Sequence, residues 1–334
     1  MKVLITGCGG YIGTTLAPYL LRNGYNVRCV DWLIFGDDTL SHVIGEKGFE
    51  LIRVDVRDVD ASCLRDVDAI IDMAAIPNDP TGELLPDLTW EVNFKARVRI
   101  ANLAKKHRVS RYILVSSASV YGRREGLVDE SSDPNPLTVY ARANLEAERS
   151  VIPLADKDFT VIVARLSTVY GVSKRMRFDL VVNTMTLTAY LENKVYVEGD
   201  GMQYRPLIHV VDVARALKLL LEAPNDKVNA QIFNIGSNEQ NYRIIDIARE
   251  VSRITEAIIV FKGEVDRRSY KLSFNKIGET IGFTPLYMIQ DAIKHLYNDL
   301  LAGIIKPEDR WFTVKWYKKL LEEGVLTTVR GASP

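Results

Sequence analysis

Cysteine is scarce in this chain, and neither sign of charge is in excess. The sequence has 3 cysteines among 334 residues, and their spacing matches no metal site. We interpret Cys8, Cys29 and Cys63 as reduced thiols and expect a reducing compartment, the cytoplasm. The 43 basic and 43 acidic residues cancel, so net charge gives no reason to expect nucleic acid or an anionic membrane as a partner.

Long apolar runs, internal repeats and linkers rich in proline or serine are also missing. No apolar stretch approaches the roughly 20 residues needed to cross a bilayer, and the apolar run after Met1 fits a first strand better than a signal peptide. Hydrophobic residues nevertheless make up 47% of the chain, which is enough for a substantial core. The composition predicts a soluble globular protein with one large domain or two unequal ones.

Short β-branched segments alternate with helix-length segments along the first half of the chain. We expect strands at 2–6, 26–31, 49–55, 69–73, 111–116 and 160–166, and helices at 11–23, 88–107 and 139–154. Strands that are apolar throughout and separated by helices predict a parallel sheet covered on both faces. This is a doubly wound α/β fold of the Rossmann type, in which ligands bind at the carboxyl ends of the strands.

The alternation weakens after about residue 167. Helices are expected at 178–192, 244–255 and 286–301, and short strands at 194–198 and 257–261. We therefore predict a first domain over residues 1–170 and a smaller, mostly helical lobe over residues 171–330. The absence of a linker indicates that the two are interleaved.

A glycine-rich segment follows the first expected strand and opens a helix, with the residues Gly7, Gly10, Tyr11, Ile12 and Gly13. Its spaced glycines allow a tight turn, close approach to a pyrophosphate and close helix packing, and the helix amino terminus attracts phosphate. Asp31 ends the second strand, where a carboxylate suits ribose hydroxyls and repels a 2′-phosphate. The pattern predicts an NAD site in residues 1–170. The alternative is a turn that only packs a βαβ unit, with Asp31 as a helix cap.

In these motifs the chain resembles the extended short-chain dehydrogenases/reductases, and among them the NAD-dependent nucleotide-sugar epimerase/dehydratase family. The resemblance covers roughly residues 1–300 and implies a substrate site in the second lobe. It also implies further cofactor contacts after the third, fourth and fifth strands and in the helix at 88–107, namely Asp55, Val56, Met73, Ala74, Ala75, Asn93 and Ser116.

A serine and a tyrosine extend this resemblance. Ser117 lies in the segment Ser-Ser-Ala-Ser-Val-Tyr-Gly after the fifth strand, and Tyr140 opens the helix at 139–154. The resemblance implies that Ser117 hydrogen-bonds the sugar oxygen that becomes a carbonyl. Tyr140 would contact the cofactor and remove or return the proton of that oxygen. Ser119 is a further expected substrate contact.

One position departs from the family pattern, which is Tyr-x-x-x-Lys. Asn144 stands where the lysine is expected, on the same helix face as Tyr140. Asparagine can hydrogen-bond the nicotinamide ribose, so we keep it as a catalytic and cofactor-binding candidate, but it carries no charge. Tyr140 should then stay near its reference pKa of about 10, because Arg142 points elsewhere. Asn144 is an introduced substitution, a natural variant in a slow or specialised enzyme, or the mark of a member without turnover.

Arginines dominate the expected substrate side. Arg205, in a segment that resembles the diphosphate-binding segment of the family, is the expected phosphate ligand. Arg267 and Arg268 either contact the pyrophosphate or sugar or form a solvated face. We interpret Asp179 as a helix N-cap and His209 as a structural residue.

The residues after Ser117 bear on the reaction. Ala118 and Ser119 bring no carboxylate, so eliminating water is disfavoured and the segment resembles that of the 4-epimerases. The alternatives are a nucleotide-sugar 4-ketoreductase or dehydrogenase, or a cofactor-binding member without catalysis. The resemblance also implies a homodimer through a four-helix interface of the helices at 88–107 and 139–154, whose charged residues equally fit a solvated face.

Overall fold

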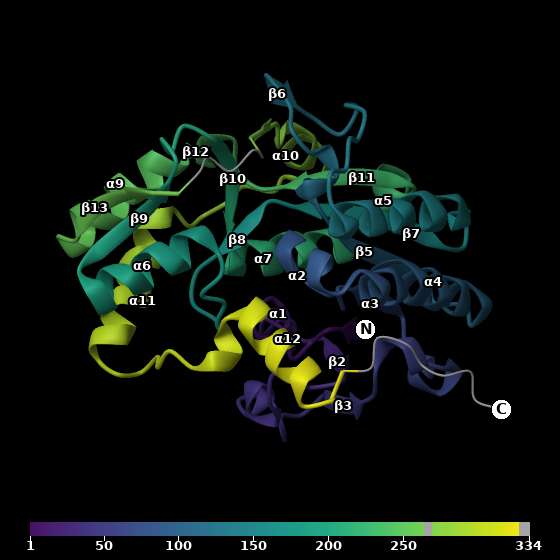
Figure 1. Cartoon of the computed structure of the whole chain (residues 1–334). Helices are drawn as coiled ribbons and strands as arrows, with labels where there is room; N and C mark the ends of the chain where they lie inside the picture. The colour runs from purple at the N-terminus through teal and green to yellow at the C-terminus, as the bar shows by residue number, and fades with distance from the viewer. Residues whose placement is uncertain (264–268, 327–334) are drawn as a thin grey trace.

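The computed structural model describes residues 1–263 and 269–326, and a seven-stranded sheet lies at its centre (Figure 1). The strand order is β11-β7-β5-β4-β1-β2-β3, and every neighbouring pair is parallel. The strands are β1 (Lys2–Thr6), β2 (Asn26–Asp31), β3 (Phe49–Arg53), β4 (Ala69–Asp72), β5 (Arg111–Ser117), β7 (Thr160–Leu166) and β11 (Gln231–Ile235). The predicted parallel α/β fold is confirmed.

Helices cover both faces of this sheet. One apolar cluster joins the sheet to α1 (Gly13–Arg22) and α7 (Val210–Glu222), with Leu16 and Leu217 among its members. A second joins the opposite face to α4 (Arg97–Lys106) and α5 (Val139–Val151), through Ile100 and Ala147. Burial on both faces explains why the strands are apolar along their whole length.

The strand β11 is not among the expected strands, although it completes the sheet beside β7. Its sequence, Gln-Ile-Phe-Asn-Ile, carries two amides that weaken the apolar pattern. Asn234 is nevertheless fully buried, because its side chain accepts a hydrogen bond from the Tyr121 hydroxyl at 2.9 Å. Both β11 and α7 come from beyond residue 170, so the chain crosses back into the first layer after entering the second lobe.

The smaller lobe is mostly helical, as predicted. It packs α6 (Val181–Glu192), α9 (Ile244–Thr255) and α11 (Ile289–Leu301) around the parallel pair β9 (Lys194–Glu198) and β13 (Ile258–Lys262). Short sheets, β12-β10-β8 and β14-β6, join it to the first layer; their strands are β6 (Leu127–Val128), β8 (Thr168–Tyr170), β10 (Tyr204–His209), β12 (Asn241–Arg243) and β14 (Lys271–Leu272).

The expected helix at 88–107 is interrupted. It consists of α3 (Pro86–Trp90), a π-helical segment η4 (Glu91–Ala96) and α4. A π-helical turn widens the backbone spiral and is frequent near functional sites. Here it carries Asn93, whose side chain accepts from the backbone N–H of Ile76 at 2.8 Å and donates to its carbonyl at 3.0 Å. Asn93 thus holds the loop after β4 in place.

The last described helix, α12 (Thr313–Glu322), returns to the first domain, where it packs against α2 (Asp79–Leu84) and the segment after β2 (Figure 1). Trp316 donates from Nε1 to the carbonyl of Ile34 at 2.7 Å, and Arg310 pairs with Asp38 at 2.5 Å just before the helix. Among the described residues, none of the helices combines the length and apolar character that crossing a membrane requires.

Candidate active site

A cavity of about 700 Å³ opens at the carboxyl ends of the sheet strands and extends into the smaller lobe. Parallel strands place their carboxyl ends at one edge, so loops distant in sequence meet there. The predicted residues that line the cavity are Gly7, Gly10, Tyr11, Ile12, Gly13, Asp31, Asp55, Val56, Met73, Ala74, Ala75, Ser116, Ser117, Ser119, Tyr140 and Arg205. Asn93 and Asn144 are not in this lining, and Arg267 and Arg268 lie outside the described residues.

The glycine turn after β1 leaves no room for side chains on its packed side. A Cβ at Gly13 would lie 2.3 Å from the carbonyl oxygen of Cys8, and one at Gly7 would lie 2.8 Å from Cα of Ala74. At Gly10 a Cβ would approach only the carbonyl of Gly7, at 3.0 Å, and would otherwise project toward the cavity. The turn is therefore a backbone cradle that fits a pyrophosphate at the start of α1.

Asp31 closes this cradle from the end of β2. Its carboxylate accepts hydrogen bonds from the backbone N–H groups of Gly9, at 2.8 Å, and Leu33, at 2.6 Å. Burial raises its pKa, and these two N–H donors act in the opposite direction. The carboxylate faces the cavity, which is the arrangement expected for recognising ribose hydroxyls.

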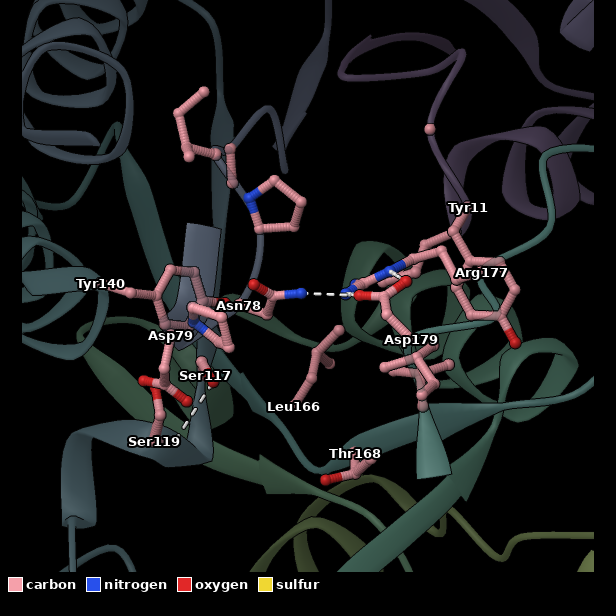
Figure 2. A pocket seen from close by; sticks show the side chains of 18 of the residues that line it. Tyr11, Asn78, Asp79, Ser117, Ser119, Tyr140, Leu166, Thr168, Arg177 and Asp179 are labelled. Carbon is pink, nitrogen blue, oxygen red and sulfur yellow. Dashed lines mark hydrogen bonds and ion pairs between the residues drawn. The ribbon is translucent and has the colours of Figure 1, made fainter. Parts of the chain in front are cut away.

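Tyr140 and Ser117 meet in the middle of the cavity (Figure 2). Ser117 is the last residue of β5, and Tyr140 lies in the first turn of α5, where the Thr138 hydroxyl caps the helix by accepting from Ala141 N–H at 3.1 Å. The Ser117 hydroxyl lies close enough to the Tyr140 phenol to lower the pKa of that phenol. This pair brings a proton carrier and a hydroxyl donor to one point, as the sequence predicts.

The neighbouring serines differ in their roles. The Ser116 hydroxyl donates to the buried carboxylate of Glu148, behind the cavity wall. Ser119 donates its backbone N–H to the Ser117 oxygen at 3.2 Å, and its own hydroxyl oxygen has no hydrogen-bond partner within the described residues. Ser119 is therefore a hydroxyl directed to the ligand space, whereas Ser116 contributes its position in the wall.

The expectation that Tyr140 keeps its reference pKa is wrong. Burial raises the pKa of the phenol, and the carboxylate of Asp79 adds to this effect. The Ser117 hydroxyl and the guanidinium groups of Arg97 and Arg177 lower the pKa, but they do not cancel the effect of burial. A cation near this phenol is therefore more important for lowering its pKa than the sequence suggests.

Asn144 is a predicted cofactor contact, but it does not line the cavity. It is buried, its amide donates to the backbone carbonyl of Tyr140 at 2.8 Å, and its oxygen accepts from Nη1 of Arg97 at 2.8 Å. Arg97 lines the cavity from the first turn of α4 and is only 1% exposed. The charged residues of this segment equally fit a solvated face in the sequence, so no local pattern singles out this arginine.

The opposite wall is built around Asp179, which is not the predicted helix cap. The N-cap position of α6 is Leu180, and the Asp179 carboxylate instead pairs with Arg177 at 2.5 Å. It also accepts from Asn78 Nδ2 at 2.6 Å and from the Thr313 hydroxyl at 2.9 Å, so it joins three distant segments (Figure 2). Burial opposes its ionisation, but Arg177 holds its pKa below the usual range.

The far end of the cavity belongs to the smaller lobe. Arg205, on β10, is 8% exposed there, and one of its guanidinium N–H groups donates to the Tyr204 carbonyl at 2.9 Å. Tyr196 and Lys262 line the same end, with the lysine ammonium 3.7 Å from the centre of the tyrosine ring. Cationic and aromatic side chains thus lie opposite the glycine cradle, where a phosphorylated, ring-bearing ligand would fit.

Comparisons with known proteins agree with this geometry. The family model described as the NAD dependent epimerase/dehydratase family matches residues 3–236. The chain belongs to this family. Its cofactor is NAD, and it is an enzyme of the epimerase/dehydratase type.

Relatives cover most of the chain at low identity. A putative UDP-glucose 4-epimerase of Methanocaldococcus jannaschii is 27% identical over 311 residues, which are 89% of this chain and 97% of the relative. An uncharacterised UDP-glucose epimerase of Bacillus subtilis is 27% identical over 266 residues, 75% of this chain and 82% of the relative.

A solved structure extends the comparison to the ligands. The UDP-glucuronic acid 4-epimerase from Bacillus cereus, in complex with UDP-glucuronic acid and NAD, has a TM-score of 0.81 and 26% identity, and the match covers 91% of this chain and 100% of that one. These three relatives are named as epimerases of UDP-sugars, and the solved structure contains NAD, which confirms the class predicted from the sequence.

Proposed function

We propose that the protein is a nucleotide-sugar 4-epimerase that keeps NAD bound and uses Tyr140 as its acid and base. The observation that carries this proposal is the presence of Tyr140 and Ser117 in the same cavity as the glycine cradle and Asp31. The names of the relatives support the nucleotide-sugar as substrate.

The position of each residue in the cavity gives it a separate role. The glycine cradle holds the pyrophosphate of NAD, Asp31 binds its adenosine ribose, and Arg205 binds the diphosphate of the substrate. Bound NAD supplies a hydride acceptor that is regenerated when the hydride returns to the same carbon. Ser117 donates to the C4 oxygen of the sugar and fixes it beside the Tyr140 phenol.

Proton transfer is the task of Tyr140. As the C4–H bond breaks and its electron pair leaves with the hydride, the phenolate takes the proton of the C4 hydroxyl, and a ketone forms at C4. The sugar then presents its other face, C4 regains the hydride, and the phenol returns the proton to the oxygen. The product is the C4 epimer, with no net oxidation.

The decisive experiment uses the protein as purified, without added cofactor. Incubation with UDP-glucose and UDP-glucuronic acid, followed by nuclear magnetic resonance of the products, should show interconversion of the C4 epimers. Tyr140→Phe should abolish it, and Ser117→Ala should reduce it by roughly 10²-fold or more, as for loss of a positioned proton-transfer group. Stoichiometric formation of NADH in place of an epimer would favour a dehydrogenase.

A second candidate is elimination of water, because the cavity holds a carboxylate that the sequence comparison at Ser117 could not reveal. Asp79, at the start of α2 (Asp79–Leu84), lines the cavity close enough to raise the pKa of Tyr140, and it accepts from the Thr138 hydroxyl at 2.6 Å. Epimerisation in deuterium oxide leaves the C5 proton in place. Elimination exchanges it and gives a product lighter by one water.

We also propose a homodimer through the outer faces of α4 and α5. Phe94 and Val98 are only partly buried in the single chain and offer apolar surface, while Lys95 and Arg149 pair within their own helices, with Glu91 and Glu146. Light scattering should give twice the chain mass, and Val98→Asp should give the monomer.

A cytoplasmic location is proposed because all three cysteines are free and buried.

A further inference from the structure

A buried cation lies beside the proposed acid and base, but on a different helix from the one that the sequence pattern indicates. Arg97, the first residue of α4, extends toward α5 and the loop after β4. Its Nη1 donates to the Asn144 oxygen at 2.8 Å, and its Nε and Nη2 donate to the Ala74 carbonyl at 3.2 and 3.0 Å. The guanidinium is thus held by two neutral acceptors on opposite sides.

These contacts fix the guanidinium without neutralising its charge. In residues 1–263 and 269–326 its hydrogen bonds go to an amide and a backbone carbonyl, whereas the buried Arg165 pairs with Glu148. The nearby carboxylate Asp72 on β4 is already bonded to Tyr112 on β5, whose hydroxyl also donates to the Arg97 carbonyl. Burying a cation without an anion is costly, so its position calls for an anionic partner that forms during function.

The Tyr140 phenolate can be that partner. The charged groups that face the phenol are Asp79 from α2, Arg97 from α4 and Arg177 from the segment before α6. Arg177 is occupied by Asp179, at 2.5 Å, while Arg97 has no such counter-ion in its hydrogen bonds. Asn144 links the two helices, because its amide donates to the Tyr140 carbonyl at 2.8 Å while its oxygen receives Arg97.

We propose that Arg97 is the positioning cation of Tyr140, docked by Asn144, and that it takes the place of the lysine expected at position 144. The proposal rests on the proposed role of Tyr140. It explains why asparagine stands at that position. A lysine there would bring an ammonium against the guanidinium that now lies 2.8 Å from the side-chain oxygen of Asn144, and like charges at that distance repel. The two arrangements therefore exclude each other.

Because Arg97 and a lysine at position 144 exclude each other, the proposal can be tested by asking whether a lysine at position 144 restores the activity that is lost without Arg97. Arg97→Gln should shift the acidic limb of the pH–rate profile for epimerisation upward by about one unit, as expected when a cation near a phenol is lost. Asn144→Lys alone should also lower the rate, because it places two cations together. The double variant Arg97→Gln/Asn144→Lys should recover at least tenfold over either single variant, and Arg97→Lys should keep the wild-type midpoint.

A second readout does not depend on turnover. Protein labelled with ¹³C at the tyrosine ring carbon that bears the hydroxyl, saturated with NAD and free of substrate, reports the ionisation of Tyr140 through the resonance missing in Tyr140→Phe. Its titration midpoint should rise in Arg97→Gln and stay unchanged in Lys95→Gln, which removes an exposed cation two residues before Arg97. If Arg97→Gln does not fold, the double variant, which restores a cation, should still fold and bind NAD.

The outcomes separate this proposal from the proposed function. An unchanged midpoint in Arg97→Gln, or a double variant whose loss equals the product of the two single losses, overturns the role of Arg97 and leaves the epimerase intact. The proposed function is overturned instead if Tyr140→Phe still turns over or if the wild type gives no epimer. In that case the resonance of Tyr140 would still respond to Arg97.

Discussion

The phenol of Tyr11 donates a hydrogen bond of 2.6 Å to the backbone carbonyl of Gly171. Tyr11 belongs to the glycine turn of the first domain, and Gly171 follows β8, where the chain enters the smaller lobe. The Tyr11 oxygen also accepts from Asn183 Nδ2, at 3.1 Å, on α6. One buried hydroxyl therefore joins the cofactor cradle to the lobe that binds the substrate.

Tyr11→Phe should weaken this junction without altering the shape of the turn. The Gly171 carbonyl and one of the two N–H groups of the Asn183 amide lose this partner, while the other N–H still donates to the Arg177 carbonyl. Each buried group left unsatisfied costs roughly 1–3 kcal/mol. Urea unfolding should show a lower midpoint for the variant. Tyr19→Phe, in α1 and only partly buried against the apolar cluster, is the matched control and should unfold like the wild type.

Asp31→Asn should change the choice of cofactor. The amide cannot accept from both Gly9 and Leu33 N–H groups, and it no longer repels a 2′-phosphate. We expect the Kd for NAD to rise by roughly tenfold, equivalent to about 1.4 kcal/mol, and the ratio of NADP to NAD affinity to increase. Equilibrium dialysis with both dinucleotides measures this ratio, and an unchanged ratio would show that Asp31 does not contact the ribose.

Two arginine–glutamate pairs that involve α5 should differ sharply in their effect on stability. Arg165 and Glu148 lie 2.6 Å apart, with side chains 2% and 1% exposed, whereas Arg149 and Glu146 are 61% and 41% exposed. Arg165→Met leaves a buried carboxylate unpaired, which costs about 3–5 kcal/mol, while Arg149→Met should cost about 0–1 kcal/mol. Chemical denaturation of both variants checks the contrast, and equal losses would contradict it.

His209 should make stability depend on pH. Burial lowers its pKa to about 4, while the unfolded chain keeps about 6.5. Because the folded form binds the proton less well, neutral His209 stabilises the fold above pH 6.5. This contribution, up to about 3 kcal/mol, is lost as the pH falls toward 4.

The helix cap explains why the neutral form is required. Nδ1 of His209 accepts the Val211 N–H at 3.2 Å at the start of α7, which a protonated ring cannot do. His209→Asn keeps a cap acceptor and should flatten the pH dependence of the unfolding free energy between pH 6.5 and 4. The exposed His107 provides the control, and His107→Asn should retain the slope of the wild type.

The predictable parts of this site are those encoded by local patterns. The glycine turn, Asp31, Ser117 and Tyr140 each follow or end an element whose type the sequence specifies, and the parallel sheet brings them to one edge. Their place in the cavity could thus be inferred from order along the chain.

The unpredicted parts depend on contacts between elements. Arg97 and Asn144 are hydrogen-bonded although they lie on different helices, and neither residue reveals the other in the sequence. Asp179 has the local pattern of a helix cap, yet Arg177, Asn78 and Thr313 draw its carboxylate into the cavity wall. Burial, which decides both cases, is a property of the packed chain and not of a segment.

The return of α12 to the first domain has a practical consequence for protein engineering. Tyr317 and Leu326 line the cavity, so a group joined directly to Leu326 would begin beside the dinucleotide cleft. The opening strand β1 starts at the amino edge of the sheet, across the molecule from that cleft, and Met1 is 47% exposed. An affinity tag, a fluorophore or a surface anchor placed before β1 should therefore interfere less with ligand exchange than one that is joined directly to Leu326.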